Sequence, residues 1–456
     1  FGSSHVGLSI LRRLVRGTPP TSASTMPLCP RSKRGHDGSD VRAYPKAGEP
    51  YKKTDPDKFE QKLLADEAPR TSTLPYQSLV LPLAEAQQAL EEAAKEKVPL
   101  DSELDAVESS SCGERDATVD HFSVCVVGAG AIGCHIAYVL HKAGNDVTLV
   151  ARGENLKALQ SEGLRMRIGG EDLPPVWIKA TDCPEQVGHV DYVFLTMKVS
   201  GYDSTVAKMI QPLVGDHTTI LPPTTSIPYW WFYKWQGQFE NRRLNQVDPC
   251  DVLWGLMPPE KVVGFTMWLS AVQLGPGRAE LRHVQRGYPL GELDGSSSKR
   301  VERLAAAFER GGIPAPRVPC IRSEIFIKSL NSLVFNVVAV LGDASNGTIA
   351  DAPEAVEVLR TAMQECEVIA EALGLTIAQT AEGRIKQTLS ARMHTMSMLH
   401  DLRIGKDLEL RALWTSFEDL AGLIGVQLPL TKALVGVALL REAAERKQRA
   451  EASGGS

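Results

Sequence analysis

The chain has 456 residues, of which 43% are hydrophobic and 23% are charged, and its formal net charge is −5. This is the composition of a globular protein with room for at least two domains. The slight negative charge gives no reason to expect nucleic acid or an anionic membrane as a partner, and no apolar run reaches the ~20 residues of a membrane span.

The first 120 residues differ from the rest. Six basic residues precede the first acid, Asp37, and Ser and Thr are frequent. An amphipathic, Arg-rich and acid-poor start is typical of an organelle transit peptide, while a disordered basic tail, or untranslated sequence ahead of Met26, explains it equally well. A polar stretch follows, with one helical candidate at 83–97. We expect 1–120 to be a largely disordered or targeting extension.

Apolar strand-like segments alternate with helix-like segments from residue 121 onward. The first strand, 122–127, precedes a helix over 134–143 that Gly144 ends. Because such alternation is typical of parallel sheets covered by helices, we expect a doubly wound, Rossmann-type α/β domain over 121–318. Further strands are expected at 147–150, 164–168, 176–180, 192–196 and 218–221, and the aromatic-rich stretch 229–233 is expected to pack in the core.

Helical patterns dominate after residue 318. Pro353 is a typical first residue of a helix, and Gly374 is a typical stop. We therefore expect an all-α domain over 319–448, followed by a disordered tail over 449–456. The predicted helices are 324–341, 354–373, 382–399, 408–424 and 431–446.

A glycine-rich turn joins the first strand to the first helix. Its residues are Gly128, Ala129, Gly130, Ala131, Ile132 and Gly133. This G-x-G-x-x-G pattern suits a dinucleotide, because the first Gly allows the tight turn, the second lets the backbone approach the pyrophosphate, and the third lets helix and strand pack closely. A turn without a ligand is the alternative, but the strand before it and the helix after it favour a dinucleotide site.

The end of the second strand bears on the choice of dinucleotide. NAD-binding folds usually carry Asp or Glu there to bind the ribose 2′-OH, whereas this chain has Ala151 and Arg152. A guanidinium can hold a 2′-phosphate by two parallel hydrogen bonds, so Arg152 favours NADP(H) over NAD(H) or a flavin; a solvated surface Arg is the alternative. Lys198 ends a later strand and is expected to add charge for phosphate, unless it only extends into solvent.

Several short motifs occur together in a fixed order. They are Gly128–Gly133, Arg152, Leu195–Lys198, Ile227–Tyr233, Val247–Pro249, Pro289–Glu292, Lys328 with Asn336, and Ser397–Asp401 followed by Glu409. In this order and spacing they resemble the ketopantoate reductases (2-dehydropantoate 2-reductases) over about residues 122–446. The resemblance implies a Rossmann domain that binds NADPH, a helical domain that closes over the substrate, and a place in pantothenate biosynthesis.

The resemblance also implies roles for polar residues of the helical domain. Lys328 matches the Lys that polarises the ketone and delivers a proton as hydride arrives, although its pattern also fits a side chain that extends into solvent. Glu409 matches a Glu that binds the substrate hydroxyl and helps to place the Lys, although an acid in the first turn of a helix is common. Asn336 and Ser397 match substrate-binding residues; a buried Asn can instead satisfy a backbone carbonyl.

Two polar positions depart from the family pattern. The Asn of the family's Gln-Asn-Gly stretch, which contacts cofactor or substrate, is Thr225 here, and a helix Asn four residues after the Lys is Ser332. We keep Thr225 as a candidate for the cofactor and Ser332 as a candidate for the substrate. Since a site built to pair with particular groups discriminates strongly, the pattern fixes the reaction type more firmly than the ketone.

The expected function is NADPH-dependent reduction of ketopantoate to pantoate, with Lys328 as general acid. The alternatives are a reductase of another 2-oxo acid or ketone, and an NADP(H)-binding regulatory protein without turnover. No metal is expected, and the scattered cysteines indicate reduced thiols. We expect a soluble intracellular protein, in the cytoplasm or an organelle matrix and not secreted. As a monomer or homodimer it would act on a small 2-oxo acid, with no nucleic-acid or membrane partner.

Overall fold

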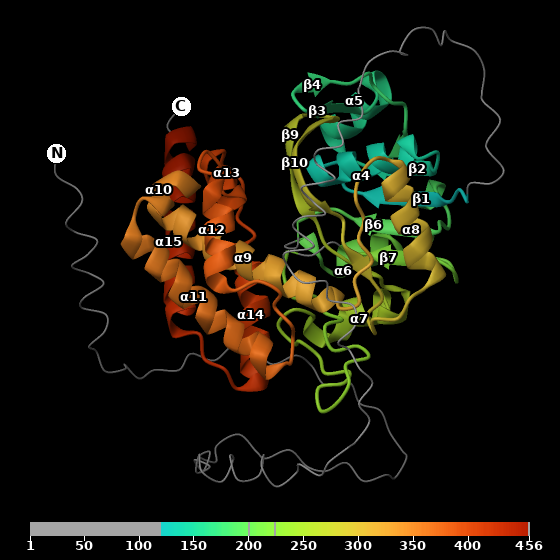
Figure 1. The fold of residues 1–456 in the computed structure, drawn as a ribbon. Coiled ribbons are helices and arrows are strands. Elements are labelled where there is room, and N and C mark those ends of the chain that lie inside the picture. The colour runs from blue at the N-terminus through green and yellow to red at the C-terminus, as the bar shows by residue number, and fades with distance from the viewer. Residues whose placement is uncertain (1–119, 199–200, 223–224, 455–456) are drawn as a thin grey trace, which may run out of the picture. The chain divides into compact units, whose positions relative to one another are not determined.

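The structure is a computed structural model that describes residues 120–198, 201–222 and 225–454 (Figure 1). All of these residues belong to one compact unit. The predicted N-terminal extension, Asp120 aside, and the last two residues of the predicted tail lie outside the described residues.

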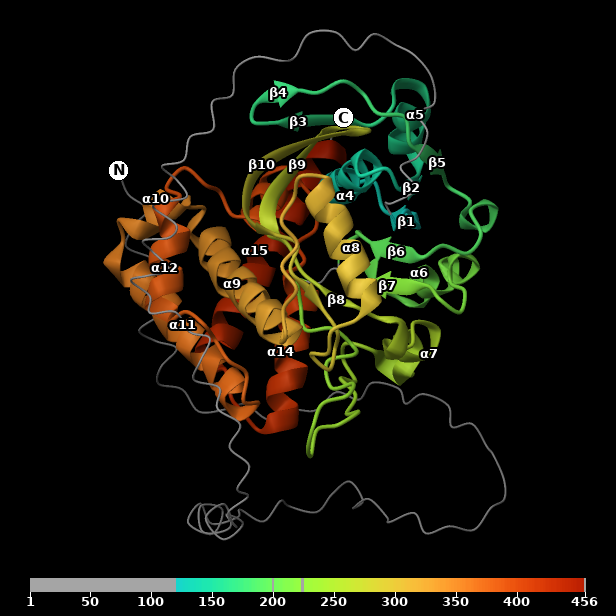
Figure 2. The ribbon, with the colours of Figure 1, turned by 45° about the vertical axis from the view of Figure 1, so that its right-hand side comes forward.

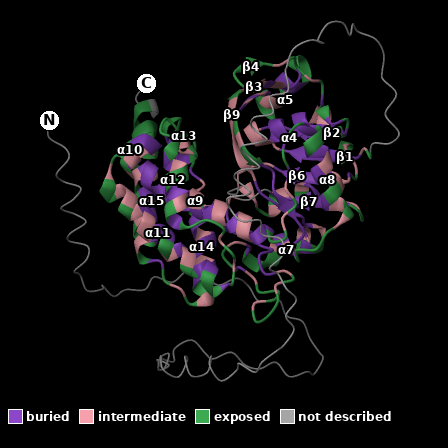
Figure 3. Cartoon of the chain, viewed as in Figure 1, coloured by how far each residue is buried: buried purple, intermediate pink, exposed green. Residues whose placement is uncertain are grey.

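A parallel sheet forms the centre of the first part of the chain. Its strand order is β5-β2-β1-β6-β7, and every pair of neighbours is parallel. The central strands are rich in Val and Leu and are buried almost throughout, as expected for a sheet covered on both faces (Figure 3). The strands are β1 (Ser123–Val127), β2 (Asp146–Val150), β5 (Lys179–Thr181), β6 (Tyr192–Leu195) and β7 (Thr219–Leu221).

Short crossover helices connect these strands. Helix α4 follows the glycine-rich turn and packs on β1 and β2 and also against a long hairpin, β9–β10 (Figure 2). The helices of this part are α4 (Ala131–Lys142), α5 (Gly153–Glu162), α6 (Ser204–Met209), α7 (Val252–Leu256) and α8 (Lys299–Arg310). The doubly wound α/β architecture expected from the sequence is therefore confirmed.

A second sheet corrects one detail of that expectation. The segment predicted at 164–168 does not join the parallel sheet but forms part of a separate sheet with order β4-β3-β10-β9. Gly169 and Gly170, both with positive φ, turn the chain back on itself after β3, so β3 pairs with its own hairpin partner. The strands are β3 (Arg165–Ile168), β4 (Glu171–Asp172), β9 (Trp268–Gly275) and β10 (Arg278–Gly287); β8 (Gly264–Phe265) and β11 (Leu290–Gly291) form a third, two-stranded sheet.

The C-terminal part is all-α, as expected (orange to red in Figure 1). Helix α9 packs against α11, α13, α14 and α15. It is long and apolar enough to cross a membrane, but most of it is buried among these neighbours, as in the core helix of a folded domain. The helices are α9 (Ile321–Gly342), α10 (Asn346–Ala350), α11 (Pro353–Ala372), α12 (Ala381–Ser390), α13 (Ser397–Arg403), α14 (Leu410–Ile424) and α15 (Pro429–Gly454).

Two helix predictions are corrected. The single helix expected over 382–399 is two helices, α12 and α13, because the carbonyls of Arg392 and His394 accept hydrogen bonds from the backbone of α10 and hold the intervening chain out of helical geometry. The expected tail is helical up to Gly454. There the Arg449 guanidinium donates to the carbonyl oxygen of Leu402, which ties the last turns of α15 to α13.

A buried histidine in α4 leads to a prediction about pH. His135 is fully buried, and its Nδ1 lies 2.7 Å from the hydroxyl of Tyr288, while its Nε2 has no partner among the described residues. Burial lowers the pKa of His135 from 6.5 to about 4. The imidazole of His135 is therefore protonated near pH 6.5 in the unfolded chain but only near pH 4 in the folded protein. Because the unfolded chain binds more protons between these values, the free energy of unfolding falls as the pH drops from 6.5 to 4.

We expect this histidine to remove up to ~3 kcal/mol of stability between pH 6.5 and 4. Urea unfolding at a series of pH values, for the wild type and for His135→Gln, measures the contribution. The wild type should lose more stability than the variant over this window. Parallel curves would show that His135 does not titrate as its burial implies.

Candidate active site

The three glycines of the turn have different surroundings that match their expected roles. Gly128 has φ +110°, and a Cβ there would lie 3.0 Å from the Thr196 hydroxyl. A Cβ at Gly133 would lie 1.9 Å from the carbonyl oxygen of Gly128, so α4 can approach β1 only with Gly here. Gly130 is the N-cap of α4, and a Cβ there would meet nothing within 4 Å. The turn is thus tight on the protein side and open at the helix N-terminus, where backbone N–H groups can receive a pyrophosphate.

Other residues of the turn contribute mainly backbone. Ala129 is buried, and Ala131 and Ile132 are half-buried against the core. Thr196, which the sequence interpretation missed, holds the turn in place. Its hydroxyl lies 3.1 Å from the carbonyl oxygen of Val127 and 2.8 Å from that of Gly128. The signal was its position directly after β6, at the carboxyl edge of the sheet.

Arg152 and Lys198 both follow strands, but they have different partners. Arg152 is exposed at the N-cap of α5, and its guanidinium forms no hydrogen bond or ion pair within the described ranges. Lys198 is engaged: its Nζ lies 2.8 Å from Asp401 Oδ2 and 3.1 Å from the carbonyl oxygen of Asp407. Lys198 therefore links the end of β6 to α13 and to the segment before α14, and its role toward a phosphate stays a prediction.

Lys328 lies against an aromatic ring that the sequence interpretation did not single out. Its Nζ is 5.2 Å from the centre of the Trp268 ring, on β9. The indole N–H of Trp268 donates to Glu324, one turn before Lys328 on α9, and Glu324 also pairs with Arg286 at 2.9 Å. Burial lowers the pKa of Lys328 below its ordinary 10.5. In the part of the chain that the structure describes, the ammonium has no ion-pair partner; its positive charge lies against the ring and also helps to lower the pKa of His394.

Asn336 and Ser397 come together, as expected, but the amide is used within the protein. The Asn336 Nδ2 donates to the carbonyl oxygen of Ser332 at 2.7 Å. Its Oδ1 accepts from the backbone N–H of Met398 at 2.9 Å and from the Ser397 hydroxyl at 3.4 Å. Asn336 is almost fully buried and so fixes the first turn of α13 to α9. Ser332 and Thr225 are half-buried.

Glu409 does not pair with Lys328. It is the N-cap of α14, and its negative charge, together with burial, raises the pKa of Tyr202. No ion pair joins it to Lys328 in the described ranges, and burial is the cause of the Lys328 shift, with no opposing carboxylate. The role of Glu409 toward Lys328 and the substrate stays a prediction.

The aromatic run 229–233 is core packing, as expected. Trp230, Trp231 and Phe232 are fully buried. The run is held by a residue that was not predicted, Arg322 of α9, whose guanidinium donates to the carbonyl oxygens of Trp231, Leu293 and Tyr233. Across the described residues, no group of three metal-ligating side chains could hold a metal ion.

Comparison with known proteins identifies the family. A model of the ketopantoate reductase PanE/ApbA family matches residues 124–223, and a model of the C-terminal part of that family matches 320–442. Over 326 residues the chain is 35% identical to the 2-dehydropantoate 2-reductase of Mesorhizobium japonicum, a match that covers 71% of this chain and 98% of that protein. This chain belongs to the ketopantoate reductase family.

Further matches agree with an oxidoreductase of this family. A model of pyridine nucleotide-disulphide oxidoreductases matches residues 47–168, which include the glycine turn. A protein assigned to the ketopantoate reductases, from Ralstonia solanacearum MolK2, is 30% identical with a TM-score of 0.66 over 72% of this chain and 99% of that one. D-mandelate dehydrogenase, solved with NADH and anilino(oxo)acetate, is 19% identical with a TM-score of 0.59 over 71% of this chain and 99% of that one, and shares the fold.

Within this ketopantoate reductase fold, the polar candidates of the helical part lie at three places. Asn336, Ser332 and Ser397 lie together where α9 meets α13. Lys328 lies on the same helix, two turns earlier, against β9. Glu409 lies near Tyr202, at the start of α14. A substrate that touches both Lys328 and Glu409 must therefore bridge them, because the protein does not join them directly.

Proposed function

We propose that this protein is an NADPH-dependent reductase of 2-oxo acids and that its substrate is 2-dehydropantoate, which it converts to pantoate. The observation that carries the proposal is the half-buried Lys328 against Trp268, with no ion-pair partner in the described ranges, in a chain 35% identical to a 2-dehydropantoate 2-reductase. Removing an ammonium from water without a counterion costs free energy, so a Lys of this kind in a core helix is typical of a functional site.

The residues of the chain fit the chemistry of ketone reduction. When bound, the dinucleotide supplies a hydride to the carbonyl carbon. Charge then develops on the carbonyl oxygen, where the Lys328 ammonium stabilises it and donates a proton. A pKa below the ordinary value makes that proton easier to give. Asn336 acts as a positioning residue by fixing the turn that presents Ser397, and Glu409 would accept a hydrogen bond from a substrate hydroxyl.

Residues of the first part fit the cofactor. The turn Gly128–Gly133 would hold the pyrophosphate at the open N-terminus of α4. Arg152, exposed and without an ion-pair partner within the described ranges, would hold the 2′-phosphate. Thr225, at the carboxyl edge of the sheet after β7, would face the nicotinamide side, and Lys198 is the second candidate for phosphate.

The role of Arg152 gives a prediction about cofactor choice. Arg152→Ala should weaken NADPH binding by about 10- to 100-fold, since it removes one charge-assisted pair, and should leave NADH binding nearly unchanged. Calorimetric titration with both dinucleotides measures the difference. Lys157→Ala, exposed on the same helix, is the matched control. Equal losses for NADPH and NADH would contradict the assignment of Arg152 to the 2′-phosphate.

The function itself is tested with a panel of ketones. Purified protein is mixed with NADPH, or in parallel with NADH, and each of 2-dehydropantoate, pyruvate, 2-oxoisovalerate and phenylglyoxylate, and cofactor absorbance is followed. Fastest turnover with NADPH and 2-dehydropantoate supports the proposal. Oxidation no faster than with Lys328→Ala, for every ketone, would overturn it and favour a dinucleotide-binding protein without turnover.

A second candidate is reduction of a different 2-oxo acid. Two positions expected to carry Asn amides are Thr225 and Ser332, and the Asn336 amide is fully engaged by the protein. Fewer amides then remain to pair with the hydroxyl of 2-dehydropantoate. D-mandelate dehydrogenase shares the fold, so the scaffold accommodates other substrates. Fastest turnover on phenylglyoxylate or 2-oxoisovalerate would favour this candidate.

A further inference from the structure

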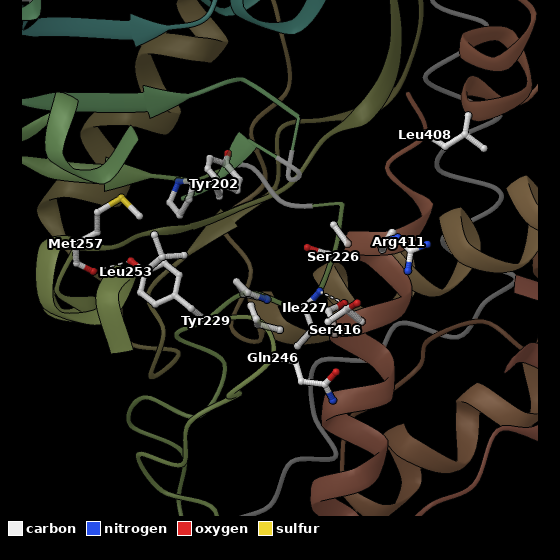
Figure 4. Close-up of a pocket in the computed structure, with 15 residues that line it drawn as sticks. Tyr202, Ser226, Ile227, Tyr229, Gln246, Leu253, Met257, Leu408, Arg411 and Ser416 are labelled. Carbon is white, nitrogen blue, oxygen red and sulfur yellow. Dashed lines mark hydrogen bonds between the residues drawn. The ribbon is translucent and has the colours of Figure 1, made fainter. Parts of the chain in front are cut away.

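A cavity of about 350 Å³ lies at the carboxyl edge of the parallel sheet (Figure 4). Its walls come from Tyr202 after β6, from Pro222 and 226–229 after β7, from the stretch 246–257 that includes helix α7, and from 408–416 in and just before α14. The lining residues are Tyr202, Pro222, Ser226, Ile227, Pro228, Tyr229, Gln246, Val247, Leu253, Met257, Leu408, Arg411, Ala412, Thr415 and Ser416. Its size is that of a small-molecule site.

Most of the cavity wall is apolar or already satisfied. The hydroxyl of Tyr229 donates to the carbonyl oxygen of Met257. The Ser416 hydroxyl accepts from the backbone N–H of Ile227 and donates to Leu413. These groups close the wall and offer little to a ligand except apolar surface.

Four polar side chains of the lining form no hydrogen bond or ion pair within the described ranges, those of Ser226, Gln246, Arg411 and Thr415. Ser226 is 2% exposed, yet its hydroxyl forms no hydrogen bond. Because Ser226 lines the cavity, its hydroxyl can form a hydrogen bond with a ligand there. Arg411 is exposed at the first turn of α14 and forms no ion pair. The cavity therefore combines an apolar chamber with one cation and a few side chains that can form hydrogen bonds.

The cavity is not lined by Lys328 or its neighbours, although Tyr202, which lines it, lies near Glu409. No residue of α9, which carries Lys328, lines it, and neither does Trp268 nor the segment 391–397. Glu409 lies two positions before Arg411, and side chains two positions apart do not face each other on a helix. An anion held by Arg411 therefore does not have to displace the Glu409 carboxylate.

We propose that this cavity is a second ligand site, which binds a small organic carboxylate with a compact apolar body. The carboxylate pairs with the Arg411 guanidinium and accepts a hydrogen bond from Ser226, and the apolar body fills the chamber between Ile227, Tyr229 and Met257. A free carboxylic acid and the terminal carboxylate of a larger molecule with a neighbouring apolar group share this chemistry. The site does not depend on ketone reduction.

Calorimetry with phenylacetate tests the proposal on the full chain, first alone and then saturated with NADP⁺. We expect saturable binding at one site per chain in both states. Arg411→Gln should weaken it by at least about tenfold, because the charge-assisted pair is lost. Ala412→Phe, which fills the chamber and keeps the charge, should abolish it. Phenylacetamide, neutral and of the same shape, should bind at least about tenfold more weakly.

Lys328→Ala is the control that separates the two sites, and it should bind phenylacetate as the wild type does. The proposal is overturned if phenylacetate shows no saturable binding, or if Arg411→Gln and Ala412→Phe leave binding intact. It is also overturned if Lys328→Ala or NADP⁺ abolishes binding, because the ligand would then occupy the substrate or nicotinamide site. A thermal melt of each variant confirms that it is folded.

Discussion

Replacing Lys328 with Ala is expected to lower kcat for ketone reduction by about 10²- to 10⁴-fold, the contribution typical of a positioned general acid. The affinity for NADPH should stay unchanged, because Lys328 lies on α9 against Trp268, while the proposed cofactor residues lie on the glycine turn and at the end of β2. Steady-state kinetics with the best ketone of the panel, together with calorimetric titration of NADPH, measures both quantities.

The pH dependence separates a proton donor from a residue that only packs. A general acid must be protonated, so the wild-type rate should fall as the pH rises through the pKa of Lys328, which burial places below 10.5. Lys328→Arg keeps the charge but holds its proton too tightly to donate it, so its kcat should remain low. Lys386→Ala, exposed on α12, is the control and should behave as the wild type. Substantial turnover by Lys328→Ala would remove the proposed general acid.

Local sequence patterns predicted the strands, turns and helix ends whose conformation depends on neighbouring residues. The run from Ser123 to Gly133 combines a buried strand, a tight turn and a helix start, and each of these leaves a mark on neighbouring residues. The hairpin β9–β10 was missed because it is only partly buried and so lacks a clean alternation of apolar and polar residues. The break between α12 and α13 was missed because its cause lies far away in sequence, in α10.

The candidate site also has a part that the sequence predicted, the residues themselves, and a part that it did not, their contacts. Residue types at matched positions picked out Lys328, Asn336 and Ser397, but not what each one touches. Trp268 lies 60 residues before Lys328, and only the fold brings the ring to the ammonium. The surroundings of Glu409, which lies near Tyr202, are likewise decided by tertiary structure, because they depend on the position of α14 relative to α9. The sequence indicates which groups are available, and the packing decides which of them meet.

Loss of Arg322 is expected to have the largest effect on stability. Its guanidinium is almost fully buried and donates to three carbonyl oxygens, those of Trp231, Leu293 and Tyr233. Arg322→Met keeps the apolar stem but leaves these carbonyls without donors, at about 1–2 kcal/mol each. We expect the free energy of unfolding to fall by ~3–5 kcal/mol, a large share of the ~5–15 kcal/mol of a typical domain. Urea unfolding at neutral pH measures it.

Two further variants show whether the buried hydrogen bonds cause this loss. Arg317→Met removes a guanidinium that pairs with Glu302 and Glu309 near the surface, and it should cost no more than ~1 kcal/mol. Burial lowers the pKa of Arg322 to about 10, so a Lys at this position, which starts from a lower ordinary pKa, should lose its proton closer to neutrality. Between the lowered pKa of the folded state and the ordinary pKa of the unfolded chain, the unfolded chain binds more protons. Arg322→Lys should therefore become more stable as the pH rises from 6 to 9, whereas the wild type should not. If Arg322→Met and Arg317→Met lowered the free energy of unfolding equally, the aromatic run 229–233 would keep its position without the Arg322 guanidinium. Apolar contacts alone would then position α9.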